Sequence, residues 1–273
     1  PTVSKTEYWV HNLDPFLFQF TESFGIRYYG LAYALGFLAG MWLLHLFCKH
    51  GKAELTAEQQ SFIITSMMIG VLLGGRIGYM LFYAIEDVLH RPWVIFQVWK
   101  GGMASHGGFI GVLIACWWVA KKLNLSFLQL GDILCPLVPP GILLGRIANF
   151  INGELWGKVS HVSWAVIFPQ SAPLGTPLEL IAPRHPSQLY AAGLEGGILL
   201  AYSQWRLWKT DALNHPGRLS GEFLMIYAVV RIFGEQFRQP DAPLIMDLSR
   251  GSFYSIFLLI AGAFLIVLSR KKS

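Results

Sequence analysis

Polar side chains that could bind an anion gather at the end of one long apolar run. The run begins near residue 131, and Arg146, Asn149, Asn152 and Glu154 come at its end. An arginine at the centre of a bilayer costs roughly 2.5–3.5 kcal/mol on insertion scales. We therefore expect these four side chains to lie at or just below a membrane surface, where a polar group holds them.

Two further arginines lie inside apolar runs, so three in all need a partner. Arg76, Arg146 and Arg231 would together cost about 7–10 kcal/mol if they were unpaired. Tyr227, Arg231 and Glu235 are spaced four apart and share one face of a helix. Two interpretations are open: an Arg231–Glu235 ion pair that serves packing alone, or an arginine shared between Glu235 and an anionic ligand.

The ligand interpretation gains support from Arg146 and Asn149, which are three residues apart and share a helical face. Two buried guanidinium groups near the same leaflet suit a phosphate, because each planar fork can donate two parallel hydrogen bonds to it.

His106 stands between glycine pairs at 101–102 and 107–108. Glycines on both sides let the backbone approach a ligand or adopt a positive φ. A histidine at the edge of an apolar run is either an interfacial hydrogen-bonding residue or a general base. The sequence leaves both roles open.

The composition is that of a membrane protein. The chain has 273 residues, of which 54% are hydrophobic and 14% charged, whereas soluble domains carry about 25% charged residues. The net charge of +5 comes from short clusters between apolar runs, which is the membrane-orientation pattern and not a nucleic-acid-binding surface. Cys48, Cys116 and Cys135 lie far apart and predict small buried side chains without a disulfide or metal site.

The apolar runs predict an all-α polytopic membrane protein with about seven transmembrane helices in a single domain over residues 1–273. The expected spans are about 29–47, 61–85, 107–120, 133–150, 189–205, 221–237 and 253–268. Pro136, Pro139 and Pro140 interrupt the fourth, so its freed carbonyls need protein or water around them.

Two segments outside the spans have a composition of their own. Residues 152–187 are polar and proline-rich, with an alternating stretch at 162–168, and predict a small extracytoplasmic head with a short strand. Residues 86–105 mix aromatic and charged side chains and predict an interfacial segment.

Positive charges favour an N-terminus outside and a C-terminus in the cytoplasm. With seven spans, ten lysines and arginines fall on the C-terminal side, including Lys121, Lys122 and Arg206, against eight on the other. That orientation places Arg146, the head and the loop before His106 on the outer side. No zinc-protease helix, phosphate-binding glycine loop or nucleophile elbow is present in the sequence, and no cofactor or metal is expected.

Residues 145–157 match the signature Gly-Arg-x-(Gly/Ala)-Asn-Phe-x-Asn-x-Glu-x-x-Gly at every fixed position. This stretch resembles that of bacterial phosphatidylglycerol–prolipoprotein diacylglyceryl transferases. The resemblance extends over nearly the whole chain, through motifs at 29–30, 74–79, 101–107, 184–190 and 231–241. One departure is Ala191, where the family often has a glutamate after the tyrosine matching Tyr190, although Glu195 is retained further along.

The resemblance implies a transferase of the bacterial inner membrane that acts in lipoprotein biosynthesis, or protein lipidation. It moves the diacylglyceryl group of phosphatidylglycerol to the cysteine thiol of a prolipoprotein lipobox, forming a thioether and releasing glycerol 1-phosphate. The implied catalytic residues are His106 as the base, with Arg146 and Arg231 on the phosphate. The implied substrate-binding residues are Tyr29, Arg76, Asn149, Asn152, Glu154, Gly157, Tyr227, Glu235 and Arg238.

A multipass carrier or flippase for an anionic lipid or solute is the alternative from another class. It explains buried arginines and broken helices equally well, but it needs neither the outer head nor the glycine frame around His106. Purified protein given phosphatidylglycerol and a lipobox peptide separates the two, because a carrier moves lipid without making a diacylglyceryl peptide.

Overall fold

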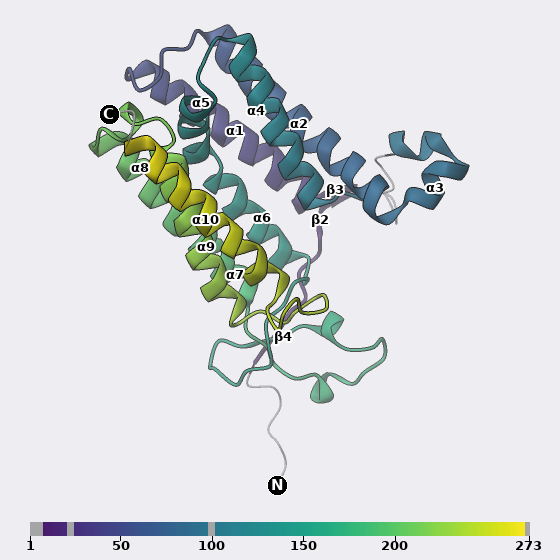
Figure 1. Cartoon of the computed structure of the whole chain (residues 1–273). Helices are drawn as coiled ribbons and strands as arrows, with labels where there is room; N and C mark the ends of the chain where they lie inside the picture. The colour runs from purple at the N-terminus through teal and green to yellow at the C-terminus, as the bar shows by residue number, and fades with distance from the viewer. Residues whose placement is uncertain (1–7, 21–24, 98–101, 271–273) are drawn as a thin grey trace. The chain divides into compact units, whose positions relative to one another are not determined.

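The computed structural model describes residues 8–20, 25–97 and 102–270, and most of them are helical (Figure 1). The chain divides into two compact units, which are treated separately below. The first unit contains Pro1–Gly40 and Cys135–Ser273, and the second contains Met41–Leu134. Helix α1 (Tyr28–Lys49) begins in the first unit and continues into the second.

The first unit is built from helices in the C-terminal half of the chain. They are η3 (Cys135–Leu137), α6 (Pro139–Ile151), α7 (Ser187–Ala191), the π-helical segment η6 (Ala192–Ile198), α8 (Leu199–Lys209), η7 (Ala212–Asn214), α9 (Arg218–Glu235) and α10 (Arg250–Arg270). Helices α9 and α10 pack side by side over their length (Figure 1). Their backbones approach closely at Gly221 and Gly262, where an added Cβ on either glycine would lie 2.7 Å from the carbonyl oxygen of the other. Small residues at such contacts are typical of helices packed within membranes.

The non-helical part of the first unit forms two small sheets. β1 (Trp9–Val10) pairs in parallel with β4 (Val166–Ile167), and β2 (Phe16–Gln19) pairs antiparallel with β3 (Gly25–Arg27). The predicted strand at 162–168 is therefore confirmed only over two residues near its C-terminal end, Val166 and Ile167. Short 3-10 turns η4 (Pro169–Ser171) and η5 (Leu178–Leu180) make up most of the remaining regular structure described in the predicted head.

The second unit is held together by α2 (Ala57–Tyr83) and α4 (Ser105–Lys122). Gly74 and Gly78 of α2 face Gly107 of α4, and a Cβ at any of the three would collide with the backbone opposite. Helix α5 (Phe127–Leu134) follows α4, and α3 (Ile85–His90) with η1 (Pro92–Phe96) follows α2. The predicted interfacial segment is thus partly helical, while its residues 98–101 lie outside the described ones.

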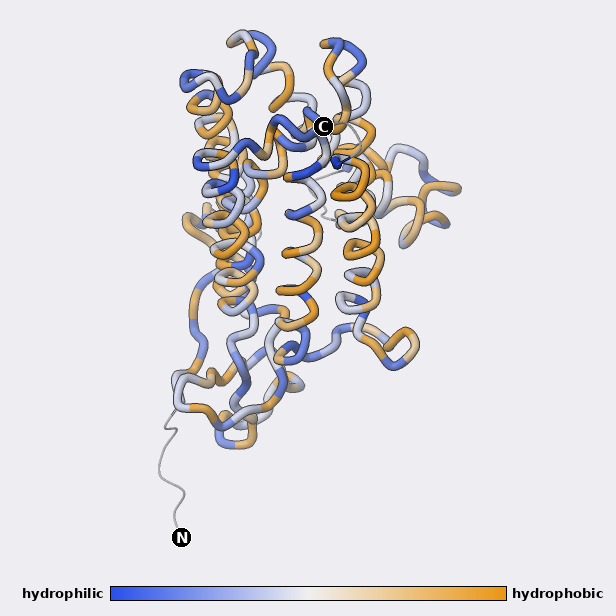
Figure 2. The backbone as a smooth tube through the Cα atoms, turned by 60° about the vertical axis from the view of Figure 1, so that its left-hand side comes forward, coloured by the Kyte–Doolittle hydropathy of each residue, from blue (hydrophilic) through white to orange (hydrophobic). Residues whose placement is uncertain are grey.

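A helix forms at each of the positions predicted to span the membrane. By length and hydropathy α1, α2 and α10 qualify as membrane-crossing helices. A fourth candidate is the pair Phe127–Leu137 and Pro139–Ile151, which is bent by 42° at the predicted proline break. Figure 2 shows hydrophobic residues along the middle of these long helices and hydrophilic residues toward their ends. The protein is therefore mostly helical, with several helices long and apolar enough to span a membrane, and the full set of seven spans stays a prediction.

Candidate functional site

A buried carboxylate joins the two arginines that the sequence left without certain partners. Glu195 is 1% exposed, and its Oε2 accepts hydrogen bonds from Nε and Nη2 of Arg146 at 3.2 and 2.8 Å. Its Oε1 accepts one from Nη1 of Arg231 at 2.7 Å. Two helices distant in sequence, α6 and α9, thus present their guanidinium groups to one acid on η6.

The network continues along the end of α9. Nη2 of Arg231 lies 2.8 Å from Oε1 of Glu235, and Nη1 of Arg238 lies 3.9 Å from the same oxygen. We call these five residues, Arg146, Glu195, Arg231, Glu235 and Arg238, the arginine cluster. Nη2 of Arg238 also donates to Oδ2 of the exposed Asp241 at 2.8 Å, so each of the three guanidinium groups has a carboxylate partner. The arginine side chains keep 19%, 15% and 13% of their surface exposed, so the cluster is accessible to an anion.

Local backbone geometry brings Glu195 to this position. Glu195 lies on the π-helical segment η6, and π-helical turns within helices are frequent at functional sites. Gly196 lets η6 approach α6, because a Cβ there would lie 2.7 Å from Cα of Leu143. The close approach of the two helices puts the Glu195 carboxylate within reach of Arg146.

Two further residues surround the arginine cluster. The Tyr227 side chain interacts with Arg146, Arg231 and Glu195. Gly251, in the first turn of α10, packs directly on the Arg231–Glu235 pair: a Cβ there would lie 2.6 Å from Cδ of Glu235 and 3.0 Å from Nε of Arg231. The start of α10 therefore covers one side of the pair.

A second polar group forms where α6 ends. Asn149 is 4% exposed, and its Nδ2 donates to Oε1 of Glu154 at 2.7 Å and to the Tyr29 hydroxyl at 3.4 Å. Nδ2 of Asn152 donates to the same Glu154 oxygen at 3.4 Å. Oδ1 of Asn152 is buried and has no hydrogen-bond partner among the described residues. The chain turns sharply here, because Gly153 and Leu155 both take positive φ values, 66° and 58°.

Gly157 ties this turn to the end of α9. It forms an isolated antiparallel bridge with Arg238, and its amide donates to the carbonyl of His185 at 2.9 Å. A Cβ at Gly157 would lie 2.5 Å from that carbonyl oxygen and 2.7 Å from the carbonyl oxygen of Phe237. Glycine is therefore required here for a close backbone approach, and its part in substrate binding stays a prediction.

His185 belongs to an aromatic group that supports the same junction. Nδ1 of His185 lies 3.1 Å from the Tyr190 hydroxyl, which also accepts a hydrogen bond of 2.6 Å from Nε1 of Trp164. The His185 and Tyr190 rings both pack edge-on against Phe237, at 5.3 and 5.6 Å between centroids. Burial lowers the pKa of His185 below its ordinary value, so the neutral imidazole is favoured.

Arg76 and His106 belong to the second unit. Arg76 is 4% exposed and donates to backbone carbonyls of Val94, Ile95, Gln97 and Gly102 at 2.7 to 3.1 Å. The guanidinium thereby fastens η1, Gln97 and Gly102 to α2. The amide of Ala104 donates to the carbonyl of Gly75 at 2.9 Å, which fixes the start of α4. His106 is the second residue of that helix and is exposed.

The structure thus brings together Tyr29, Arg146, Asn149, Asn152, Glu154, Gly157, Tyr227, Arg231, Glu235 and Arg238 in the first unit. Glu195 is the residue of this site that the sequence did not assign to it. A signal for it was present: an acid in the middle of the apolar run 189–205 needs a cationic partner as much as the buried arginines need an anionic one.

Known proteins with similar sequences belong to the family that residues 145–157 resemble. The family model for prolipoprotein diacylglyceryl transferase matches residues 15–268. A phosphatidylglycerol–prolipoprotein diacylglyceryl transferase of Legionella pneumophila (strain Corby) is 43% identical over 260 residues, which cover 93% of this chain and 96% of that protein. Proteins of the same name from Zymomonas mobilis and Vibrio cholerae are 42% and 40% identical, covering 90% and 96% of this chain and 85% and 93% of their own lengths.

Proposed function

This chain belongs to the prolipoprotein diacylglyceryl transferase family, and on that premise we propose that it lipidates prolipoproteins. It is a membrane-bound transferase of lipoprotein biosynthesis. The diacylglyceryl group comes from phosphatidylglycerol, the acceptor is the lipobox cysteine thiol, and glycerol 1-phosphate leaves. The resemblance found at residues 145–157 is confirmed at the level of the family, and family membership favours the transferase over the carrier.

The observation that carries the chemistry is the pair of arginines held by one buried carboxylate. Glu195 fixes the guanidinium groups of Arg146 and Arg231 in place through bonds of 2.8 and 2.7 Å. These bonds use only part of the five donors of each guanidinium. The remaining donors bind the lipid phosphate and stabilise the charge that develops on it as the carbon–oxygen bond breaks.

The polar group at the end of α6 suits the glycerol part of the headgroup. The buried Oδ1 of Asn152 needs a donor, and a glycerol hydroxyl supplies one. Glu154 and Tyr29 orient Asn149 beside it. Tyr227 and Glu235 hold Arg231. Arg238, just after the end of α9 and beside Glu235 and Asp241, guides the anionic lipid to the site through guanidinium donors that these contacts leave available.

We assign proton removal to His106. A cysteine thiol with a pKa of about 8.5 is mostly protonated at neutral pH, so a base accelerates its reaction by roughly 10²–10⁴. The sulfur–carbon bond forms as the carbon–oxygen bond breaks; the thiol proton passes to the imidazole and the bonding pair leaves with the phosphate oxygen. For Arg76, whose predicted role is substrate binding, the contacts within the second unit support a role in positioning the loop before His106.

We propose the predicted seven-span topology for the membrane domain, with residues 152–187 as a head outside the cytoplasm and 86–105 at the interface. The membrane is the bacterial inner membrane, and the N-terminus is outside. The excess of lysines and arginines on the membrane face that carries the C-terminus supports this orientation.

The deciding experiment supplies the purified full-length chain with phosphatidylglycerol and a lipobox peptide, and detects the thioether by mass spectrometry. We expect a diacylglyceryl peptide from the unchanged chain and none above background from Arg146→Ala or Arg231→Ala, both still inserted in the membrane. Lipid movement without thioether formation would support a carrier instead, and full activity of both variants would exclude the arginines from the reaction.

The role of His106 has its own test. His106→Gln keeps a hydrogen-bonding side chain but removes the base, so we expect slower thioether formation that recovers in part at higher pH, where more thiolate is present. His90→Gln, on the exposed helix α3 of the same unit, is the matched control. An unchanged rate and pH profile in His106→Gln would assign the base to another group.

A further inference from the structure

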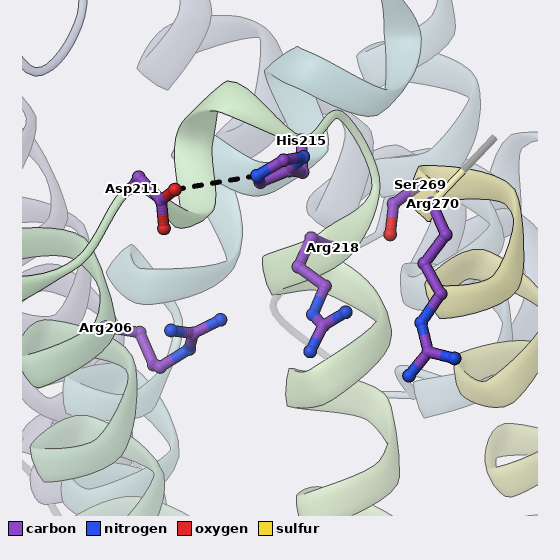
Figure 3. Close-up of a pocket in the computed structure, with 6 residues that line it drawn as sticks. All are labelled: Arg206, Asp211, His215, Arg218, Ser269 and Arg270. Carbon is purple, nitrogen blue, oxygen red and sulfur yellow. Dashed lines mark ion pairs between the residues drawn. The ribbon is translucent and has the colours of Figure 1, made fainter. Parts of the chain in front are cut away.

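A second cluster of arginines surrounds a cavity at the opposite end of α9. The cavity has a volume of about 390 Å³ and is lined by the residues drawn in Figure 3: Arg206, Asp211, His215, Arg218, Ser269 and Arg270. They come from the end of α8, the turn after it, the start of α9 and the end of α10. Arg218 is 17 residues from Glu235 on α9, or about 25 Å along a helix, so the cavity is distinct from the arginine cluster.

Part of this charge is neutralised internally. Glu222 accepts hydrogen bonds from Nε and Nη2 of Arg206 at 2.6 and 2.8 Å, and one of 2.6 Å from Nε of Arg218. The third donor group of Arg206, Nη1, bonds the hydroxyl of Thr210 at 3.0 Å. Arg206 is therefore engaged within the protein, and it holds Glu222 in position for Arg218.

The remaining charge faces the cavity. Within residues 8–20, 25–97 and 102–270, the terminal nitrogens of Arg218 and the whole guanidinium of Arg270 have no hydrogen-bond or ion-pair partner. Nε2 of His215 lies 3.6 Å from Oδ2 of Asp211. Figure 3 shows the guanidinium groups of Arg218 and Arg270 extending in the same direction from neighbouring helices. Three arginines against Asp211 and Glu222 leave a net positive charge.

We propose that this cavity binds a phosphate group through Arg218 and Arg270. Two guanidinium forks that face one volume match the geometry of a phosphate, which accepts paired hydrogen bonds from each. The positive end of the α9 dipole lies at Arg218 and also favours the negative charge of a phosphate. The phosphate belongs either to an anionic phospholipid, whose headgroup basic pockets between membrane helices bind, or to a soluble phosphate compound, which presents the same group to the arginines.

Binding measured with two probes separates these sources. The full-length chain in uncharged detergent is titrated with dioleoylphosphatidylserine and followed by native mass spectrometry, and separately with inorganic phosphate and followed by thermal unfolding. Phosphatidylserine is chosen because it is anionic and lacks the glycerol headgroup. The test variant is Arg218→Gln/Arg270→Gln. The control is Lys209→Gln, which removes an exposed positive charge from α8 outside the cavity.

We expect the double variant to bind one of the two probes at least about tenfold more weakly than the unchanged chain, because it removes two positive charges and their hydrogen bonds to the phosphate. Lys209→Gln should bind as the unchanged chain does. The arginine cluster is the same in all of these proteins, so the difference between them measures the cavity alone. A loss confined to the lipid identifies a phospholipid site, and a loss confined to inorganic phosphate identifies a soluble ligand.

Equal binding of both probes by the double variant and the control would overturn the proposal. If the double variant does not fold, Arg270→Gln alone replaces it, because Arg270 is exposed at the end of α10 and bonds no other described residue. That variant should still lose affinity severalfold, and unchanged binding there would likewise reject the site.

Discussion

Glu195 determines whether two arginines can be buried close together. Its carboxylate is 1% exposed and bonds both Arg146 and Arg231. Without it, two guanidinium groups would repel each other in a region of low dielectric constant. The acid thus makes the phosphate-binding arrangement stable before any substrate arrives.

Replacing Glu195 by glutamine tests that role. Removing one partner of a buried ion pair typically costs about 3–5 kcal/mol, so we expect Glu195→Gln to lower the melting temperature by several degrees and to reduce thioether formation strongly. Glu179→Gln makes the same chemical change at an exposed position in the head and should leave both unchanged. Equal melting temperatures for the two variants would mean that Glu195 is not the residue that holds the arginines.

His185 gives the head a dependence on pH. Burial holds its pKa in the folded chain below the ordinary value of about 6.5, so the unfolded chain binds more protons between those two pKa values. The stabilisation is complete above about pH 6.5 and is lost as the pH falls from there toward the lower pKa of the folded state. The Tyr190 hydroxyl can donate to Nδ1 only while that nitrogen is unprotonated.

We therefore expect the melting temperature of the unchanged chain to fall between pH 7.5 and pH 5.5, and to fall less in His185→Asn. His161→Asn, also in the head and exposed, controls for the loss of an imidazole. The measurement is thermal unfolding in detergent at both pH values. The same pH dependence in all three proteins would show that His185 does not contribute to it.

At the scale of elements, helix α10 restrains the site through a single glycine. Gly251 has no side chain, so the first turn of α10 rests on the Arg231–Glu235 pair. An added methyl group would have to displace the pair or push the helix away. Such overpacking costs about 1–3 kcal/mol.

Gly251→Ala should therefore lower kcat/KM for thioether formation roughly tenfold, because the orientation of Arg231 changes. Gly193→Ala on η6 is the matched control, since a Cβ there meets no atom within 4 Å and alanine favours a helix over glycine. If Gly251→Ala were as active as Gly193→Ala, α10 would not be positioning Arg231.

The helices and the polar end of α6 follow from the sequence, but the partners of the arginines do not. Apolar periodicity and prolines place a helix at every predicted span and a break near Pro139. The four-residue spacing of Arg231 and Glu235 predicts their ion pair, which the structure contains. The link to Glu195 depends on a π-helical segment and on the close approach of Gly196 to Leu143, and neither has a periodic sequence signal. Arg76 likewise bonds backbone carbonyls, whose positions no residue type specifies.

The arginine cluster and the phosphate-binding cavity lie at opposite ends of helix α9. Arg218 begins the helix and Glu235 ends it, and about 25 Å between them approaches the roughly 30 Å of a hydrocarbon core. If α9 crosses the membrane, the arginine cluster and the phosphate-binding cavity lie near opposite surfaces. The transferase site then faces one leaflet and the cavity faces the other.

Labelling of single cysteines decides which surface is which. Cys48, Cys116 and Cys135 are first replaced. Cysteine is then introduced at one of three exposed positions: Leu174 in the head, Lys209 at the end of α8, or Lys122 at the end of α4. With the head outside, a membrane-impermeant maleimide should label intact spheroplasts at position 174 alone, and should label all three positions once the membrane is opened. Labelling of 209 and 122 in intact spheroplasts, with 174 protected, would reverse the orientation and place the arginine cluster at the cytoplasmic surface. Labelling at 209 but not at 122 in intact spheroplasts would place these two positions on opposite sides of the membrane. The number of crossings between them would then be odd, whereas the seven-span topology requires two, so that result would exclude the topology.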